Sequence, residues 1–189
     1  MTTQNIETLF TGNISIEYRQ FYVDFDVDND ENYYEEDDEY DDFLDIEIAF
    51  ENQENGLCGA GQKEKLFLIA GIQNGTIQID VKFHDSRPDI DESFEDIVEC
   101  NFTVGKYPIF LCEWGHENIY ALNLPLSNYI VRYNISGMDL DYDEEEDYEK
   151  PIPEQKHLLQ FWKANSIDDK IIKTTSKVAK YWHDNVMRK

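Results

Sequence analysis

Basic residues are scarce in this sequence. Its 16 lysine and arginine residues stand against 41 aspartate and glutamate residues, which gives a formal net charge of −25. A surface this acidic repels the phosphate backbone of DNA and RNA, so we expect no direct nucleic-acid binding. Anionic membranes attract basic segments, so we expect no membrane binding through charge either.

Apolar runs of membrane-spanning length are also missing, since none reaches the roughly 18 residues that a helix needs to cross a bilayer. Residues 1–10 have neither the basic nor the apolar region of a secretion signal. The three cysteines, Cys58, Cys100 and Cys112, are an odd number without an export signal, which disfavours a disulfide framework. We therefore expect a cytoplasmic protein.

The negative charge is unevenly distributed. Residues 24–45 contain thirteen acidic residues and no basic one, and residues 139–149 contain eight acidic residues, whereas residues 163–189 carry a net charge of +4. The chain also has 12 tyrosines, 11 phenylalanines and 3 tryptophans, so we do not predict general disorder. About 150 residues outside the acidic segments are enough for one core, which predicts a single domain over 1–189.

Apolar and polar residues alternate along much of the chain, with a period of two. Residues 76–83 place Ile77, Ile79 and Val81 on one face, and the preceding apolar run is joined to them by Asn74-Gly75. Asn-Gly favours a type I′ turn, so this region predicts a β-hairpin. Further strands are predicted at residues 13–25, 46–50, 97–104, 107–114, 119–124, 129–135 and 157–162.

Seven or eight short strands separated by turns predict a mainly β fold, an antiparallel β-sandwich, although periodicity does not distinguish a sandwich from a barrel. Residues 29–42 and 139–150 interrupt the pattern and are predicted to be solvated acidic loops, because repulsion among their charges opposes compaction. Near the C-terminus the period changes to that of a helix. We predict a helix over 166–187 that packs on the sheet, with a possible break at 174–176.

The motifs that carry chemistry are weak. Asp24, Asp26, Asp28 and Glu35 stand at positions 1, 3, 5 and 12 of a calcium-binding EF-hand loop, but Asn29 replaces the glycine of position 6 and the preceding segment is strand-like. Weak binding of divalent cations by the acidic segments is the better interpretation.

Phosphate-binding and nucleophilic sites are no better supported. Residues 56–63 are rich in glycine but lack the spacing of a phosphate-binding loop, and a flexible connection is the better interpretation. Cys58, in this segment, is a candidate exposed thiol, whereas Cys100 and Cys112 lie in strand-like patterns and are expected to be buried. No histidine or cysteine pair has zinc-ligand spacing. We expect no catalytic residue, metal or cofactor.

Several short motifs, in order, resemble those of an uncharacterised family of small bacterial proteins over about residues 56–183. They are residues 56–60 (GLCGA), 74–76 (NGT), 94–99 (FEDIVE), 124–126 (LPL), 129–133 (YIVRY), 137–139 (GMD) and 158–162 (LLQFW), together with Gly71, Ser176, Ala179, Tyr181, Trp182 and His183. This resemblance implies no particular activity.

The N-terminal half resembles another family. Residues 14–23 (ISIEYRQFYV) are similar to the opening strand of the competence protein J family, which inhibits a DNA-entry nuclease. A strand into Phe83, one through Phe102, and then Gly105-Lys106-Tyr107 with a strand ending at Trp114 follow in a similar order. The acidic segment 29–42 and the C-terminal helix depart from that family's pattern. The resemblance implies a role as a nuclease inhibitor.

Charge and resemblance together predict an acidic protein that neutralises a basic protein partner, such as a nuclease toxin, because a negative surface steers onto a basic cleft. The predicted partner-binding residues are Tyr33, Tyr34, Glu35, Glu36, Asp37, Asp38, Glu39, Tyr40, Asp41, Asp42, Asp143, Glu144 and Glu145. The alternative is a housekeeping β-sandwich module whose acidity serves solubility, with weak calcium binding as a variant. An enzyme built on Cys58 or a carboxylate pair has the least support.

Overall fold

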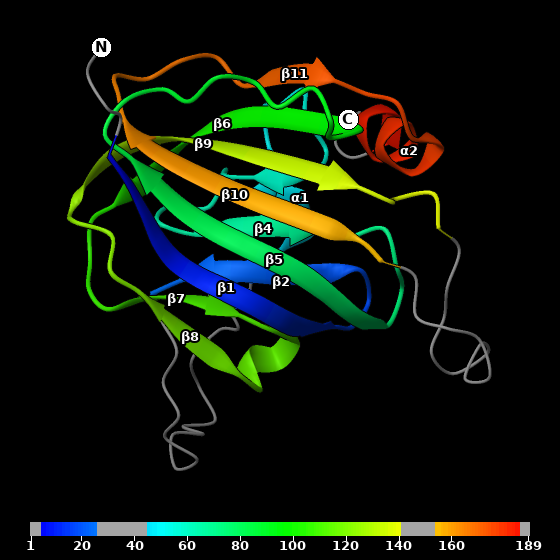
Figure 1. Cartoon of the computed structure of the whole chain (residues 1–189), viewed down its shortest axis with the longest axis horizontal. Coiled ribbons are helices and arrows are strands. Elements are labelled where there is room, and N and C mark those ends of the chain that lie inside the picture. Colours follow the sequence, from blue (N-terminus) through cyan, green and yellow to red (C-terminus); the bar gives the residue numbers. More distant parts are fainter. Residues whose placement is uncertain (1–4, 26–44, 141–153, 186–189) are drawn as a thin grey trace.

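The computed structural model of the chain describes residues 5–25, 45–140 and 154–185, and they form two β-sheets that lie face to face (Figure 1). In spatial order, the strands of the larger sheet are β1 (Ile6–Ile16), β5 (Gly75–His84), β10 (Lys156–Lys163), β9 (Ser127–Ser136), β6 (Asp96–Val104) and β11 (Lys170–Lys173). The strands of the smaller sheet are β3 (Cys58–Gly59), β4 (Leu66–Ile69), β2 (Gln20–Asp24), β7 (Ile109–Cys112) and β8 (Ile119–Leu122). The helices are α1 (Ile46–Ala49), η1 (Trp114–His116) and α2 (Lys177–Asn185).

The apolar core fills the space between the two sheets, because each strand directs alternate side chains towards the other sheet. Ile77 and Ile79 of β5 are buried on this inner face, and Tyr133 of β9 meets Phe21 of β2 edge-on with ring centroids 6.1 Å apart. The predicted β-sandwich with a C-terminal helix is therefore confirmed.

The strand pairing has one feature that alternation does not reveal. All pairs are antiparallel except β5 and β10, which run parallel with His157 opposite Ile79. β10 (156–163) lies between β9, the strand just before it in the chain, and β5, which comes much earlier, so a late strand completes the centre of the sheet. The described residues hold eleven strands rather than seven or eight, partly because several are only two to five residues long.

The predicted strand 13–25 is two strands that belong to different sheets. β1 ends at Ile16, and the chain turns through Tyr18 and Arg19, both with positive φ, before β2 begins. Non-glycine residues rarely adopt this conformation. Here hydrogen bonds fix the turn, because Arg19 N donates to Gln73 O at 2.9 Å and Ala70 N donates to Arg19 O at 2.7 Å.

The predicted strand 46–50 is wrong, because Ile46–Ala49 form the short helix α1. Asp45 caps this helix by accepting a hydrogen bond from Glu47 N at 2.7 Å. The helix lies against the glycine-rich segment, where a Cβ on Gly61 would stand 2.1 Å from Ile48 O. The glycines of residues 56–63 thus allow close backbone approach and are not merely a flexible connection.

The predicted helix 166–187 is wrong in its first half, because residues 170–173 form β11 at the edge of the larger sheet. β-branched residues such as Ile171 and Ile172 suit a strand where a sheet edge is free to pair. Only α2 is helical. Asp96 accepts hydrogen bonds from Thr175 N and Ser176 N just before it, and Asp139 accepts from the first-turn amide of Lys177 at 2.8 Å.

Two carboxylates close the open sides of the sandwich. On one side, Glu113 after β7 accepts hydrogen bonds from Ser15 N of β1 at 2.9 Å and from the Tyr120 hydroxyl at 3.1 Å. On the other side, Asp169 before β11 accepts hydrogen bonds from Glu54 N at 2.9 Å and Asn55 N at 2.8 Å, in the loop before β3. Each carboxylate therefore links an edge of one sheet to the other sheet.

Within the described part of the chain, no helix has both the length and the apolar character required to cross a bilayer. The assignment of residues 1–189 to a single domain stays a prediction.

His157 is a polar residue inside the core. Its Nδ1 lies 2.6 Å from the Tyr133 hydroxyl and its Nε2 lies 3.2 Å from Gln155 Oε1, so the neutral ring is held between two partners. Burial lowers the pKa of His157 from 6.5 to about 3. The folded protein therefore keeps this ring neutral at pH values at which the unfolded chain protonates it.

The variant Asp169→Ala should be less stable than the wild type by about 1–3 kcal/mol, because backbone amides in the loop before β3 lose a charged acceptor. Urea denaturation followed by tryptophan fluorescence measures this. Asp168→Ala is the matched control, since Asp168 is an exposed neighbour of the same charge. Equal midpoints for the two variants would contradict the linking role of Asp169.

His157 should make the stability of the wild type pH-dependent. Its contribution is fully present above pH 6.5, is lost by up to ~1.4 kcal/mol per pH unit as the pH falls, and levels off near pH 3. His157→Gln removes the titrating group, so the wild type minus variant difference in unfolding free energy should shrink between pH 7.5 and pH 4.5. A difference that is constant over this range would show that the ring protonates in the folded state.

Candidate functional site

The predicted partner-binding residues fall outside the described part of the chain. This holds for the first set, 33–42, and for Asp143, Glu144 and Glu145. The structure does describe where both acidic segments join the fold. The first follows β2 and precedes α1, and the second lies between β9 and β10.

Asp24 marks the start of the first acidic segment. It is fully buried, and its carboxylate lies 3.3 Å from Lys65 Nζ and 3.6 Å from His116 Nε2. Its Oδ1 also accepts a hydrogen bond from Phe25 N at 2.7 Å. The residue at position 1 of the calcium-like pattern is thus engaged by a lysine, a histidine and a backbone amide, which compete with a cation for it.

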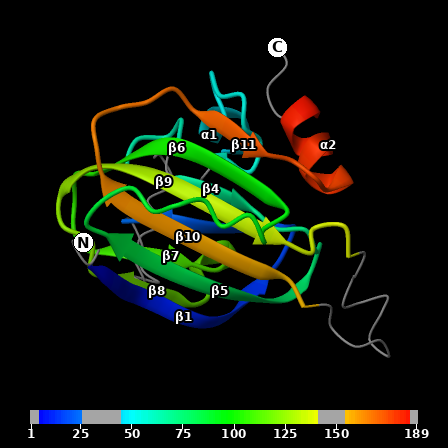
Figure 2. The ribbon, with the colours of Figure 1, turned by 45° about the horizontal axis from the view of Figure 1, so that its top comes forward.

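A third acidic segment, residues 85–95, is well described. We call it the strap, because it connects β5 to β6 and passes over the outer face of the larger sheet (Figure 2). Its exposed acidic residues are Asp85, Asp89, Asp91, Glu92 and Glu95, and its single basic residue is Arg87. It is less conspicuous in the sequence, because five acids spaced over eleven positions are less dense than the acids of the other two acidic segments.

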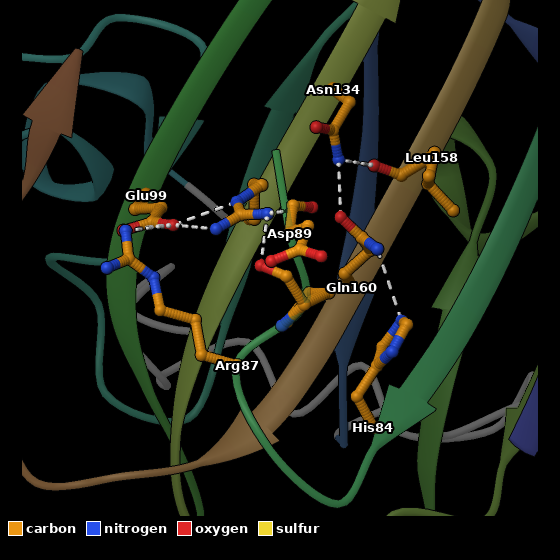
Figure 3. Close-up of polar contacts among 9 residues, drawn as sticks. His84, Arg87, Asp89, Glu99, Asn134, Leu158 and Gln160 are labelled. Atoms are coloured by element: carbon orange, nitrogen blue, oxygen red, sulfur yellow. Dashed lines mark hydrogen bonds and ion pairs between the residues drawn. The ribbon is translucent and has the colours of Figure 1, made fainter. Parts of the chain in front are cut away.

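A buried ion pair holds the strap on the sheet. Glu99 of β6 and Arg132 of β9 are 1% and 0% exposed, and Arg132 Nη2 lies 2.7 Å from Glu99 Oε1. The remaining guanidinium donor, Nη1, reaches two strap carbonyls, Pro88 O and Asp89 O, at 3.0 Å each. The strap's own Arg87 contacts the other side of Glu99 at 3.1 Å (Figure 3).

The sequence explains why Arg132 lies there. In β9 the residues on either side of it, Val131 and Tyr133, point into the core, so Arg132 points to the outer face of the sheet. The Trp162 ring of the adjacent strand β10 lies beside its guanidinium, 5.2 Å away. A buried charge requires a partner and further hydrogen bonds, and Glu99 with the strap carbonyls supplies both.

A row of polar side chains continues across the same outer face. Asn134 Nδ2 donates to Gln160 Oε1 at 3.1 Å, and Gln160 Nε2 lies 3.1 Å from His84 Nε2 (Figure 3). An amide nitrogen only donates, so His84 accepts and is neutral. Burial lowers the pKa of His84, and the nearby Lys82 and Arg132 cations lower it further. This row orders the sheet surface and offers no general base near a nucleophile.

The strap also displays an apolar side chain. Ile90 is 38% exposed and stands between Asp89 and Asp91 at the outside of the molecule. Protein interfaces combine apolar anchors with charged rims, so this arrangement suits contact with a basic protein surface. It is also preorganised, because Arg132 and the Lys173 Nζ bonds to Glu92 O and Phe94 O hold the backbone.

The thiols and histidines do not form a nucleophilic site. Cys58, predicted to be exposed, is fully buried, and its hydrogen bond with Cys100 and its burial raise its pKa. Burial also raises the pKa of Cys112, and Cys100 and Cys112 are buried as predicted. His183 Nδ1 accepts a hydrogen bond from Gly56 N at 2.9 Å. Among residues 5–25, 45–140 and 154–185, no three metal-ligating side chains lie together.

Comparison with known proteins places this architecture among solved structures. The crystal structure of ComJ from Bacillus subtilis, an inhibitor of the DNA-degrading activity of NucA, superposes with a TM-score of 0.50 at 16% identity, covering 85% of this chain and 99% of ComJ. Crocagin biosynthetic gene J superposes with a TM-score of 0.53 at 14% identity, covering 87% of this chain and 100% of that protein. No protein-family model and no curated protein sequence matches the chain.

The chain thus shares the fold of ComJ, in agreement with the resemblance of residues 14–23 to the competence protein J family. At these identities the likeness concerns the fold alone. The resemblance of residues 56–183 to an uncharacterised bacterial family stays a prediction.

The variant Arg132→Lys should release the strap, because lysine keeps the charge beside Glu99 but cannot reach the two strap carbonyls with a planar fork. We expect faster hydrogen exchange at strap amides and a stability loss of about 1–3 kcal/mol. Hydrogen exchange with mass spectrometry measures the first effect. Arg87→Lys is the control, since the Arg87 side chain is 55% exposed and should change strap exchange little. Unchanged strap exchange in Arg132→Lys would show that other contacts hold the strap.

Proposed function

We propose that this chain is an acidic binding protein that neutralises a basic protein partner, and that the partner is a nuclease. The observation that carries the proposal is the fold shared with ComJ over 99% of that protein, which inhibits the DNA-degrading activity of NucA. The charge of the chain agrees with it. A nuclease attracts phosphate through a basic cleft, and 41 acidic against 16 basic residues make this chain a competitor for such a cleft.

The mechanism is occlusion rather than chemistry. An acidic surface steers a basic partner into encounter, raises the association rate and suppresses wrong partners that carry negative charge. The inhibitor needs no catalytic residue, metal or cofactor, and it does not bind nucleic acid itself, because its own charge repels phosphate. Immunity against a nuclease toxin is the biological form of this role that we favour.

The contact residues that we propose are those selected from the sequence. The tyrosines Tyr33, Tyr34 and Tyr40 supply aromatic contacts of the kind found at binding hot spots. Glu35–Asp42 and Asp143–Glu145 supply the charge. The strap adds a fixed acidic surface with Ile90 as an apolar anchor, held in place before the partner arrives. A preordered surface loses less conformational entropy on binding than a segment that must become ordered.

The protein should capture a basic, DNA-degrading activity from a lysate of its source at low salt, and release it at high salt. Screening shortens the Debye length from about 10 Å at 0.1 M to about 3 Å at 1 M, which removes the steering and the rim contacts. The captured fraction is assayed for DNA degradation, and the purified chain is then added back. Loss of the DNA-degrading activity supports the proposal. A captured fraction without such activity, or one whose activity persists, overturns it.

Deletion of residues 29–42 should weaken binding of the captured nuclease by at least roughly tenfold, measured by calorimetry. The triple variant Asp143→Asn, Glu144→Gln, Glu145→Gln tests the second acidic segment. Its matched control is Glu7→Gln, Glu51→Gln, Glu117→Gln, which removes the same charge from three exposed positions elsewhere. Equal losses for both triple variants would mean that only net charge matters. Full affinity after the deletion would remove residues 29–42 from the interface, and acidity would then serve solubility.

A further inference from the structure

Cys58 and Cys100 face each other inside the core. Cys58 belongs to β3 of the smaller sheet and Cys100 to β6 of the larger one, and their Sγ atoms lie 3.3 Å apart. Both side chains are buried, at 0% and 1% exposure. A disulfide bond joins sulfurs at about 2.05 Å, so a movement of little more than 1 Å would bring these two to bonding distance.

Neighbouring groups hold the two thiols in register. The Cys58 carbonyl accepts hydrogen bonds from Gln53 Nε2 at 3.0 Å and from Asn55 Nδ2 at 3.2 Å. Asn55 Oδ1 in turn accepts a hydrogen bond from Cys58 N at 2.8 Å. The loop that carries Cys58 is thereby fixed on both sides of its backbone. Cys100 lies in the middle of a long paired strand, opposite Val131 of β9.

The C-terminal helix α2 packs on the loop that precedes Cys58. Gly56, two residues before Cys58, meets the backbone of this helix, since a Cβ on Gly56 would stand 2.3 Å from Trp182 O. Gly56 N also donates to His183 Nδ1 at 2.9 Å. Cys58 itself is 0% exposed, so we expect a small molecule to reach it when the loop before β3 separates from α2.

We propose that Cys58 and Cys100 are a redox-active pair that forms a reversible disulfide between the two sheets, in exchange with a low-molecular-weight disulfide such as oxidised glutathione. The linkage would lock the side of the sandwich where β3 meets β6. It is distinct from the acidic surfaces and does not rest on the proposed function.

The exchange balances as two steps. The thiolate of one cysteine attacks a sulfur of the oxidised glutathione, forms a mixed disulfide and releases one glutathione thiolate. The thiolate of the second cysteine attacks the protein sulfur of that mixed disulfide, closes the Cys58–Cys100 bond and releases the second glutathione thiolate. The two protons from the cysteines end on the two glutathione thiolates, so the protein is oxidised by two electrons and glutathione disulfide is reduced by two.

The closed structure disfavours the first step. The hydrogen bond between Cys58 and Cys100 and the burial of Cys58 raise the pKa of the Cys58 thiol. We therefore expect the attacking thiolate to form when the loop opens. Oxidation should therefore be slow and limited by opening of the contact between the loop and α2. The second step should be fast, because the two protein sulfurs already lie 3.3 Å apart.

The experiment incubates the folded wild type with oxidised glutathione at pH 8, blocks remaining thiols with iodoacetamide and digests the protein without reductant. Mass spectrometry should find the peptide that joins Cys58 to Cys100, and Cys112 should be alkylated after unfolding. Cys112 is the internal control, because it is equally buried. The oxidised protein should melt roughly 5–15 °C higher than the reduced one, and dithiothreitol should reverse the shift.

Two variants separate the steps. Cys100→Ser removes the resolving thiol, so Cys58 should accumulate as the mixed disulfide with glutathione. His183→Leu removes the acceptor for Gly56 N and should speed oxidation of the wild-type pair roughly tenfold, while Lys180→Ala on the exposed side of α2 should not. The proposal is overturned if the linked peptide is absent, if it forms only in denaturant, or if the wild type stops at mixed disulfides.

Discussion

Carboxylates that accept hydrogen bonds from backbone amides link the two sheets of this protein. A sandwich whose core lies between two sheets has two open sides, and on each side strand edges expose amide groups that need acceptors. Glu113 meets the amide of Ser15 on the β1 side, and Asp169 meets two amides before β3 on the other. Asp96 and Asp139 do the same for the entry of α2. A hydrogen bond to a charged acceptor is stronger than one between neutral groups, so each of these carboxylates contributes more to the link between the elements than a neutral acceptor would.

The negative charge of the chain as a whole opposes folding. A net charge of −25 favours expansion through self-repulsion, and most of the acidic residues that the structure describes lie outside the core. Inside, Glu99 is paired with Arg132 and Asp24 with Lys65. The acidic residues therefore fall into two groups with different roles. A few carboxylates accept structural hydrogen bonds, and the exposed ones make the described surface negative.

The sequence predicted the regular part of this fold well. Strict alternation, as in Ile77, Ile79 and Val81, reports directly which face of a strand is buried. The hairpin predicted at Asn74-Gly75 is wrong, because β4 and β5 flank this turn but belong to different sheets and do not pair with each other. The errors arise where long-range contacts override local preference. The turn at Tyr18 and Arg19 contains no turn-forming residue, and it exists because the segment 70–74 supplies its hydrogen bonds. The local sequence of residues 170–173 is compatible with a helix, but these residues form a strand because they pair with the edge of β6.

The candidate site shows the same division more sharply. The density of charge identifies residues 29–42 in the sequence, whereas the position of the strap depends on Arg132, which lies 44 residues after Pro88 and 43 after Asp89. A lone arginine in an alternating strand carries no sequence signal of what it binds. Its partners become visible only when β6, β9 and the strap are brought together, and a guanidinium with 0% exposure is costly to bury unless it has an ion-pair partner and further hydrogen bonds. Here Glu99 and two strap carbonyls compensate the buried Arg132 cation, and the same hydrogen bonds hold an acidic segment on the outer face of the sheet.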